Sequence, residues 1–504
     1  MTSGLDHVEL RQGQYHDSVT LMQASRTVSA TAGVREALIA MATALNVELA
    51  QGMGFQVPQA AAAQLLIAVR ADDQAGLDVA LSALTAALST RSASRGTSGA
   101  SGAEDPRPAT TAAALEDSDA ALALISVPGP YAAIEAFDAV AAGRNVMIFS
   151  DGVAVEDEVA LKHAGRAAGV LVMGPDCGTA IVSGIALGFA NVVRRGSVGI
   201  VAASGTGAQQ ISSLLETAGV GVSHLLGLGG RDLSAQVGGL GAELALLALD
   251  ADPDSELIVL VSKPPDPEVT QRLQSLTDGL STPVQFALLG PGQPDLTQAV
   301  ESVLAAVGTT VPTWPVVGRP QHAGQVAQLH GYFAGGTLAA EALLLADELA
   351  PISTNLGPGA VPAAQALSGG PHVVVDFGED ELTRGRAHPM IDPSLRLDQI
   401  ARLTESADGD LVLLLDVVLG YGAEPDPAQA LVPALRTAAQ RVADRGHELN
   451  VVLSLCGTDA DPQSWQCQAV ALSDAGALVF ASNAQAARHA VVLARGAIPA
   501  LTPR

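Results

Sequence analysis

Short apolar runs alternate with helical segments along most of this chain, and this alternation limits the fold more than any other feature. Between Ala121 and Gly308 the runs LALISV, NVMIFSD, VLVMGPD, SVGIVAASG, VSHLLGLGG, ELIVLVSKPP and PVQFALLG are separated by segments with helical spacing or by loops. The pattern returns after His372 with HVVVDFG, DLVLLLDVVLGYG, LNVVLSLCG and ALVFAS. Apolar strands that alternate with helices are typical of βαβ units. A protein of the α/β class with several parallel sheets is therefore predicted.

The composition supports sheets covered on both faces and disfavours some classes of ligand. Hydrophobic residues make up 48% of the chain, charged residues 15% and aromatic residues 3%, so the predicted cores consist of Ala, Val, Leu and Ile. The formal net charge of −26 disfavours binding to nucleic acid or to an anionic membrane surface. A small anion can still bind through backbone dipoles.

We expect a cytoplasmic protein. The residues from Met1 to Val19 show no basic segment followed by an apolar run, and no apolar run reaches the roughly 20 residues that a bilayer span requires. The cysteines Cys177, Cys456 and Cys467 show no CxxC spacing, which is typical of reduced thiols. Because no set of His, Cys and Asp residues has ligand spacing, no metal site is expected.

Changes in composition divide the 504 residues into segments. Residues 1–88 contain the strand-like runs HVELRQGQY, NVELAQGMGF and LLIAVRA and a helix near Asp17–Thr27, which fits a small α+β domain. Residues 89–110 include STRSASRGTSGASGAEDPRP, which has no apolar period and predicts a flexible linker. Residues 111–195 and 196–310 are predicted to form two parallel sheets. Residues 311–350 are predicted to be a connector with one helix in GYFAGGTLAAEALLLADEL, and residues 351–504 a further sheet.

The clearest candidate site is the unit SVGIVAASGTGAQQISSLL. It places Ser204, Gly205, Thr206 and Gly207 at the start of a helix that follows an apolar strand. Unpaired N–H groups and the positive end of the helix dipole favour an anion at such a position. Gln210 stands where a dinucleotide fingerprint needs its third glycine, and no Walker A lysine follows. An ordinary tight turn between strand and helix is the alternative.

A second glycine loop lies in DLVLLLDVVLGYGAEPDPAQALVPAL. Gly420, Tyr421 and Gly422 stand between an apolar strand and a helix opened by Asp426 and Pro427. The loop is a further candidate for holding an anion through its backbone, with a structural turn as the alternative.

Two other loops carry candidate side chains. In LGLGGRDLSAQVGG, Gly229 and Gly230 permit a bend and Arg231 can contact a phosphate or carboxylate, or instead form a surface ion pair with an aspartate. In MGPDCGTA, Cys177 is a candidate nucleophile, although a buried structural cysteine is the better interpretation.

The loop VDFGEDELTRGRAHPMIDP places Arg384, Arg386 and His388 among acidic residues after an apolar strand. A histidine between arginines and carboxylates can act as an acid–base group or hold an anion. His388, Arg386 and Arg231 are therefore the candidate catalytic residues, and a solvated charged loop is the alternative.

Taken together, these motifs resemble a known family. Leu122–Pro264, with LISVPGPYAAIEAFDAVAAGRNVMIFSDGV, VLVMGPDCGTAI, GSVGIVAASGTGAQQ and GLGGRD, is similar to the α-subunit of succinyl-CoA synthetase. The stretch from Val373 to about Ala487, with VVDFG and VVLGYG, is similar to the carboxyl domain of the β-subunit of that enzyme. A single chain with both pieces, and with HDSVTLM, GGTLAAEA and GRAHPMIDP, resembles the FdrA proteins.

The resemblance implies specific domains and a specific site. Residues 111–195 resemble a Rossmann-like CoA-binding domain, whereas 196–310 and 351–504 resemble the flavodoxin-like domains of the α- and β-subunits. In that family two helix N-termini hold a phosphorylated histidine between them, and the resemblance places these at Ser204–Gly207 and at Gly420–Gly422. This chain departs from the family in three ways. PVQFALLGPGQPDLTQAV lacks the histidine, residues 1–110 lack the CoA-binding glycine loop, and residues 311–350 leave no room for an ATP-grasp domain.

The departures disfavour a self-sufficient acyl-CoA ligase. The resemblance to FdrA proteins implies a subunit of an oxamate carbamoyltransferase that uses carbamoyl phosphate in allantoin and purine degradation. The alternatives are a subunit of a succinyl-CoA ligase-type (ADP-forming) synthetase and a non-catalytic ligand-binding subunit. The expected partners are a small anionic substrate, other protein subunits and further copies of the chain in a homo-oligomer. No cofactor is assigned to the chain itself, and CoA or a nucleotide would come through a partner subunit.

Overall fold

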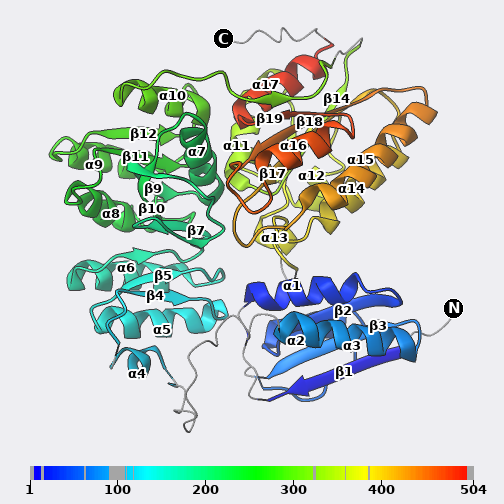
Figure 1. The fold of residues 1–504 in the computed structure, drawn as a ribbon, viewed down its shortest axis with the longest axis horizontal. Coiled ribbons are helices and arrows are strands. Elements are labelled where there is room, and N and C mark those ends of the chain that lie inside the picture. The colour runs from blue at the N-terminus through cyan, green and yellow to red at the C-terminus, as the bar shows by residue number, and fades with distance from the viewer. Residues whose placement is uncertain are drawn as a thin grey trace. The chain divides into compact units, whose positions relative to one another are not determined.

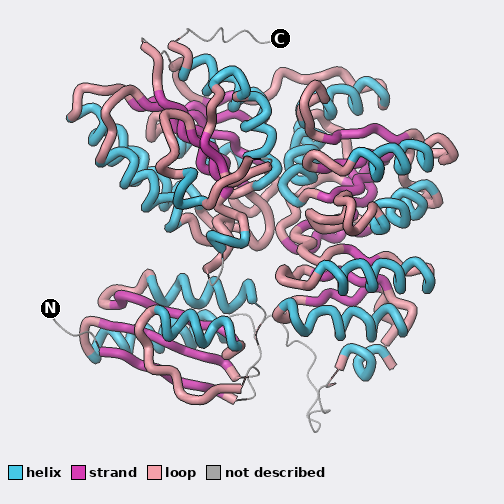
Figure 2. Tube along the Cα trace, turned by 180° about the vertical axis from the view of Figure 1, so that it is seen from behind, coloured by secondary structure: helices cyan, strands magenta, loops and turns pink. Residues whose placement is uncertain are grey.

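The computed structural model describes residues 5–12, 16, 18–61, 64–89, 108, 110–116, 118–321, 325–357, 359–383 and 386–496 (Figures 1 and 2). The chain forms two compact units. The first comprises Met1–Ala109 with the short segments Ser126–Pro128 and Thr383–Ala387, and the second comprises the remainder. Except for residues 89, 108 and 110, the predicted linker at 89–110 lies outside the described residues.

The first unit is a small α+β domain with an antiparallel sheet in the order β1-β3-β2. Its elements are β1 (Leu5–Arg11), α1 (Ser18–Ser29), β2 (Val34–Met41), α2 (Ala44–Gly52), β3 (Leu65–Ala71) and α3 (Gln74–Ser89). One prediction was wrong here, because most of NVELAQGMGF, up to Gly52, lies in α2 and VREALIAM forms the second strand. The side chain of Thr43 accepts a hydrogen bond from the N–H of Asn46 and so fixes the start of that helix.

The second unit begins with a three-stranded parallel sheet in the order β4-β5-β6. Its elements are α4 (Thr111–Leu115), β4 (Leu122–Ile125), α5 (Gly129–Ala141), β5 (Asn145–Ile148), α6 (Val155–Ala168) and β6 (Val172–Met173). These strands and helices confirm the βαβ pattern predicted for this part of the chain.

The next sheet has six strands in the order β12-β11-β9-β10-β7-β8, and its strands β12, β11, β9 and β10 are parallel. Its elements are β7 (Thr179–Val182), β8 (Ile185–Gly188), β9 (Arg195–Ala203), α7 (Gly205–Thr217), β10 (Val222–Gly227), α8 (Leu240–Asp250), β11 (Leu257–Ser262), α9 (Pro267–Thr277), β12 (Val284–Leu288) and α10 (Leu296–Ala306). The structure differs here from the predicted boundary at residue 195, because β7 pairs with β10 and so joins β7 and β8 to this sheet.

The last sheet has seven strands in the order β13-β19-β18-β17-β14-β16-β15, parallel except for β13. Its strands are β13 (Val316–Val317), β14 (Gln328–Phe333), β15 (Ser353–Thr354), β16 (Val373–Asp376), β17 (Leu411–Val418), β18 (Leu449–Cys456) and β19 (Ala477–Phe480). Its helices are α11 (Gly336–Leu345), the 3-10 turn η2 (Asp347–Leu349), α12 (Ala363–Ala366), α13 (Asp380–Thr383), α14 (Ser394–Glu405), α15 (Pro427–Asp444), α16 (Trp465–Ser473) and α17 (Asn483–Ala494).

Segment 311–350, predicted as a connector, contains the central strand β14 and the helix α11. The strand QLHGYF was missed because its polar residues and glycine interrupt the apolar run. The predicted helix in this segment is confirmed as α11.

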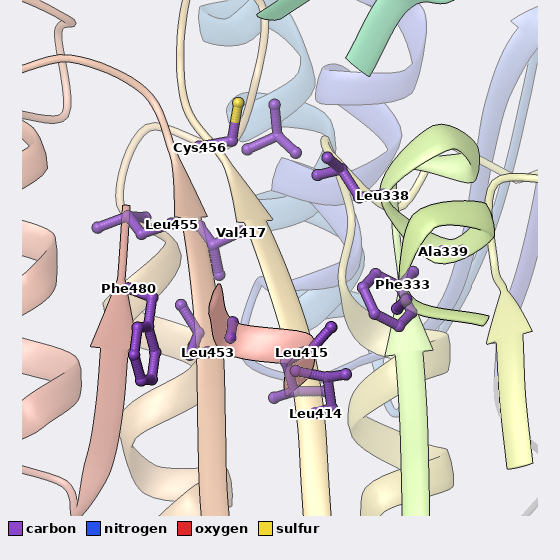
Figure 3. Close-up of a cluster of buried hydrophobic side chains, with 14 of the residues drawn as sticks. Phe333, Leu338, Ala339, Leu414, Leu415, Val417, Leu453, Leu455, Cys456 and Phe480 are labelled. Atoms are coloured by element: carbon purple, nitrogen blue, oxygen red, sulfur yellow. The ribbon is translucent and has the colours of Figure 1, made fainter. Parts of the chain in front are cut away.

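A common core joins the six- and seven-stranded sheets. Helices α7 and α10 from one sheet pack against α11 and α17 from the other, and one cluster of buried apolar side chains runs through all four helices. Figure 3 shows the part of this cluster formed by Phe333, Leu338, Leu415, Leu453 and Phe480. The core is built mainly from aliphatic side chains, as the composition predicts. Because α7 and α11 lie at this junction, their first turns come together.

Candidate functional site

The start of α7 has the geometry of an anion-binding helix terminus. The buried strand β9 ends at Ala203, and Ser204 caps the helix by accepting a hydrogen bond from the N–H of Gly207 at 2.9 Å. Gly205 is exposed and Thr206 is partly exposed. Their N–H groups have no hydrogen-bond partner within the described residues. Two donors at the positive end of the helix dipole are therefore available to a ligand.

The start of α7 contacts the start of α11. The hydroxyl groups of Ser204 and Thr337 lie 2.6 Å apart and share a hydrogen bond. A Cβ placed on Gly335 would lie 2.9 Å from two side-chain atoms of Thr206, so glycine is required at this close approach. We call the residues Ser204–Gly207 and Gly335–Thr337 the α7–α11 junction.

The turn of Gly420, Tyr421 and Gly422 lies against the side of α7, where the side chain of Gln209 donates to the carbonyl of the preceding residue, Leu419, at 3.3 Å. The turn follows β17, and α15 begins only at Pro427, as the sequence predicts. The N–H of Gly420 donates to Gln463 and the N–H of Tyr421 donates to the carbonyl of Ala190. Gly420 and Gly422 have φ values of 119° and 78°, which explains the glycines by backbone geometry. Since two of its N–H groups are engaged within the chain, this turn offers fewer free donors than the start of α7.

Two charged side chains border the start of α11. Lys263 follows β11 and Asp376 ends β16. A Cβ on Gly336 would lie 2.9 Å from Lys263 Nζ and closer still to Asp376 Oδ2. Burial raises the pKa of Asp376 to about 7, and the nearby Lys263 opposes this shift. Asp376 can therefore gain or lose a proton near neutral pH.

Asp416 of β17 holds the loop that leads into α11. Its carboxylate accepts the N–H groups of Ala334 at 2.6 Å and Gly335 at 2.7 Å, and it forms a buried ion pair with Arg396 at 2.9 Å. Burial raises the pKa of Asp416, and Arg396 opposes that shift. With all of these partners inside the protein, Asp416 has a structural role.

The candidate catalytic residues His388 and Arg386 differ in environment. His388 is partly buried, its Nδ1 accepts the N–H of Met390 at 3.3 Å, and its ring lies 6.2 Å from the ring of Phe189. Burial and the charge of Arg396 lower the pKa of His388 to about 4, so the imidazole is neutral at neutral pH. Arg386 is exposed, and Arg384 lies outside the described residues.

In the loop with Gly229, Gly230 and Arg231, the backbone and the arginine side chain contact other parts of the chain. A Cβ on Gly229, whose φ is 82°, would collide with the carbonyl oxygen of Pro175, so this glycine permits the close packing of two loops. Arg231 donates to the carbonyl of Val153 at 2.9 Å and pairs with Glu158 at 3.0 Å.

Cys177 is fully buried, and burial raises the pKa of its thiol to about 12. The thiol is therefore not a nucleophile, in agreement with the structural interpretation of this residue.

Sequence reasoning missed Lys263, Asp376 and the start of α11 as site residues. One signal was available: Lys263, Asp376 and Gly335–Thr337 all stand at or just after the carboxyl ends of parallel strands. Ligands of open α/β sheets bind at this edge, where the strand order reverses. The six-stranded sheet reverses at β9, between β10 and β11, and the seven-stranded sheet reverses at β14, between β16 and β17.

Two family models match the chain. The model described as "AllF, heavy metal-associated domain" matches residues 1–106, and the model described as "CoA-ligase" matches residues 332–493. The first match prompts the question of a metal site, but residues 1–106 contain no cysteine. Within the described residues no three His, Cys, Asp or Glu side chains are grouped to hold a metal ion. The residues present therefore do not fit a thiolate metal site.

The CoA-ligase match prompts the same question for CoA. CoA carries several phosphate groups, whereas the loops after β5 and β6 carry the acidic residues Asp151 and Asp176. Arg231, the arginine of the glycine loop that packs on Pro175, is paired with Glu158. The loops after β5 and β6, residues 149–154 and 174–178, thus carry no lysine or arginine of their own that could pair with a phosphate.

Curated relatives agree with the second model. A subunit α 2 of succinate–CoA ligase (ADP-forming) from Archaeoglobus fulgidus is 30% identical over 156 residues, which cover 30% of this chain and 52% of the relative. The corresponding α subunit from Methanothermobacter thermautotrophicus is 29% identical over 182 residues, covering 36% of this chain and 60% of the relative. The chain thus spans half to three fifths of each of these subunits.

Among the described residues, no helix has the length and apolar content needed to cross a membrane.

One relative matches almost from end to end. The protein YahF of Escherichia coli is 34% identical over 503 residues, which cover 94% of this chain and 96% of YahF. The CoA-ligase match and the succinate–CoA ligase relatives of this chain indicate the wider superfamily. The chain therefore belongs to the family of YahF, within the superfamily of CoA-ligase and succinate–CoA ligase proteins.

Proposed function

We propose that the chain is an enzyme subunit that binds the phosphoryl group of an acyl phosphate at the α7–α11 junction. The observation that carries this proposal is the contact between the first turns of α7 and α11, through Ser204 and Thr337, with the N–H groups of Gly205 and Thr206 left without partners in the described chain. Helix starts bind phosphate because their N–H groups and dipoles both favour an anion.

Within this class of substrate we propose carbamoyl phosphate, with oxamate as the acceptor. In the transfer, the nitrogen of the acceptor attacks the carbamoyl carbon, the bond to the phosphate oxygen breaks, and phosphate leaves with the electron pair. The nitrogen loses a proton. The N–H groups at the junction stabilise the charge that develops on the leaving phosphate. The resemblance to FdrA proteins and the absence of a histidine in PVQFALLGPGQPDLTQAV support this choice.

A second candidate is a subunit of an ADP-forming acyl-CoA ligase. The CoA-ligase family match at residues 332–493 and the succinate–CoA ligase relatives favour this alternative. It requires that partner subunits supply the phosphorylated residue and the binding of nucleotide and CoA.

An assay of the chain with its co-purified partners separates the two candidates. Release of phosphate from carbamoyl phosphate that depends on oxamate supports the transferase. Formation of acyl-CoA that depends on ATP, with an acid-labile phosphohistidine on this chain or on a partner, would establish the ligase instead. Binding of phosphate with no effect of Gly205 substitutions on the partners' turnover would identify a non-catalytic binding subunit.

A further inference from the structure

Lys263 is the only accessible lysine in the described part of the chain. The sequence contains two lysines, and the other, Lys162, is 1% exposed and bonded to Glu158 at 2.8 Å and to Asp232 at 2.6 Å. The side chain of Lys263 is 37% exposed, and the carboxylate of Glu379 lies 3.8 Å from its ammonium group, beyond hydrogen-bond distance. Unlike the ammonium group of Lys162, that of Lys263 therefore has N–H groups available to a ligand.

The ammonium group of Lys263 points to the start of α11. Its Nζ and Asp376 Oδ2 both lie within 3 Å of the position that a Cβ on Gly336 would take. Asp376 is 3% exposed, and its other oxygen, Oδ1, accepts the N–H of Gly378 at 2.7 Å. No hydrogen bond to Oδ2 is formed by any described residue. Asp376 Oδ2 and Lys263 Nζ therefore approach the same point at the start of α11, but the described residues form no ion pair between them within 4.0 Å.

We propose that Lys263 is the positioning residue for the anion at the α7–α11 junction, and that Asp376 takes up a proton from solvent when the anion binds. This inference rests on the proposed function, and it adds the side chains that recognise the charge of the ligand.

Charge balance explains why a proton is needed. Asp376 is faced by Lys263 after β11, by Glu379 on its own loop, and by Asp416 of β17 with its partner Arg396 of α14. His388 also approaches, because a Cβ on Gly378 would lie 2.8 Å from His388 Nε2 and 3.0 Å from Asp376 Oδ1. The imidazole is neutral above pH 6, since the pKa of His388 is lowered to about 4 by burial and by Arg396. The carboxylates of Asp376, Glu379 and Asp416 carry one more charge than the two cations Lys263 and Arg396 neutralise, and protonation of Asp376 removes this excess, which would repel an anion.

Sulfate is the probe that tests the proposal, because its own charge does not change between about pH 6 and 9. We expect calorimetric titration at about pH 7 to show that Lys263→Met weakens sulfate binding about tenfold to hundredfold, the effect of one charge-assisted hydrogen bond. Lys263→Arg, which keeps the charge, should retain most of the affinity. The matched control is Arg195→Gln, which removes an exposed cation that pairs with Asp254.

The pH profile tests the role of Asp376. In the unmodified chain the affinity for sulfate should fall about tenfold per pH unit above the pKa of Asp376, which is about 7. Asp376→Asn keeps the acceptor for the N–H of Gly378 and should make the profile shallower over the same range, where Asp176, which also interacts with Lys263 and has a pKa of about 7, still titrates. An unchanged slope in this variant contradicts the proposed proton uptake.

The small number of lysines allows an independent check. Brief treatment with an amine-directed acylating reagent should modify Lys263, and saturating sulfate or phosphate should protect it, as measured by peptide mass spectrometry. Binding of sulfate without protection of Lys263, and with full affinity in Lys263→Met, would overturn this inference and leave the proposed function standing. Failure of the unmodified chain to bind either anion would overturn the proposed function itself.

Discussion

Glu341 is a carboxyl group enclosed by the protein interior on α11. One oxygen accepts the N–H of Leu296 at 2.7 Å and the other accepts the side-chain amide of Asn483 at 2.7 Å. Burial raises the pKa of Glu341 to about 7, although these two hydrogen bonds act in the opposite direction. The folded state therefore holds a proton on Glu341 at pH values where the unfolded chain has released it.

This proton makes stability depend on pH. A carboxyl group whose pKa is raised by folding stabilises the folded state less as the pH rises from its unfolded pKa of 4.5 to its folded pKa of about 7. Between about pH 5 and 8, we expect the unfolding free energy to fall less with rising pH in Glu341→Gln than in the unmodified chain. The amide oxygen introduced by this substitution would keep an acceptor for the N–H of Leu296. Its NH₂ group would face Asn483 Nδ2, so it can donate to Asn483 Oδ1 only after the Asn483 amide has turned over.

Urea unfolding at a series of pH values measures this effect. The difference in unfolding free energy between Glu341→Gln and the unmodified chain should change with pH across this window, in favour of the variant as the pH rises. A difference that is constant with pH would show that Glu341 is already charged in the folded protein.

At the residue scale, the sequence predicted where a helix begins better than it predicted which side chains lie close together or carry a charge. Ser204–Gly207 stand at the start of a helix, as predicted from a serine and two glycines after an apolar strand. Asp376 and Lys263 were not predicted as site residues, because their proximity depends on contact between two sheets that are distant in sequence. The neutral state of His388 was also not predictable, since it follows from burial and from Arg396.

The start of α11 depends on the buried pair of Asp416 and Arg396. Asp416 accepts two backbone N–H groups at this helix start, and Arg396 donates both to its carboxylate and to its backbone carbonyl. Removal of one partner of such a pair leaves a buried charge without compensation.

We therefore expect Asp416→Ala to lower the unfolding free energy by about 3–5 kcal/mol. Asp254→Ala is the matched control, because it breaks the exposed ion pair with Arg195 and should cost at most about 1 kcal/mol. Equal effects of the two substitutions in chemical denaturation would contradict the structural role of Asp416.

Strands with continuous apolar runs were predicted correctly, whereas segments that mix apolar and polar residues were not. The strands β11, β16 and β17 are buried along their whole length and β9 over its last six residues, and each was evident in the sequence. NVELAQGMGF was mistaken for a strand because its alternation of apolar and polar residues is short, and capping by Thr43 favours the helix. In β14 the buried residues include His330 and Gly331, which no apolar pattern reveals.

At the scale of the whole molecule, the sequence predicted the α/β class correctly, but it did not predict which strands share a sheet. β7 pairs with β10, and β14 pairs with β16 and β17; local composition does not predict such pairing between strands that are not consecutive in the sequence. The predicted linker at 89–110 lies almost wholly outside the described residues, so its position stays a prediction.

Limited proteolysis tests this boundary. We expect the first cleavage between residues 89 and 110, which leaves a stable fragment that begins near Thr110 and contains the second unit. Sequencing of the fragment ends identifies the site. First cleavage inside 121–308 would show that the six-stranded sheet is less stable than this account requires.

The central claim, that the α7–α11 junction binds a phosphoryl group through free N–H groups, can be tested at one residue. Gly205 is the first residue of α7, where proline fits a helix but removes the N–H. Ser204 already has the extended backbone that a following proline prefers, and a Cβ at Gly205 meets only Thr179 Oγ1, at 3.6 Å. Gly205→Ala keeps the N–H and is the matched control.

Calorimetric titration of phosphate into these two variants and the unmodified chain is the most direct measurement. The account predicts that Gly205→Ala binds phosphate as the unmodified chain does, whereas Gly205→Pro binds about tenfold to hundredfold more weakly with an unchanged unfolding temperature. Equal affinity in a folded Gly205→Pro variant would contradict it.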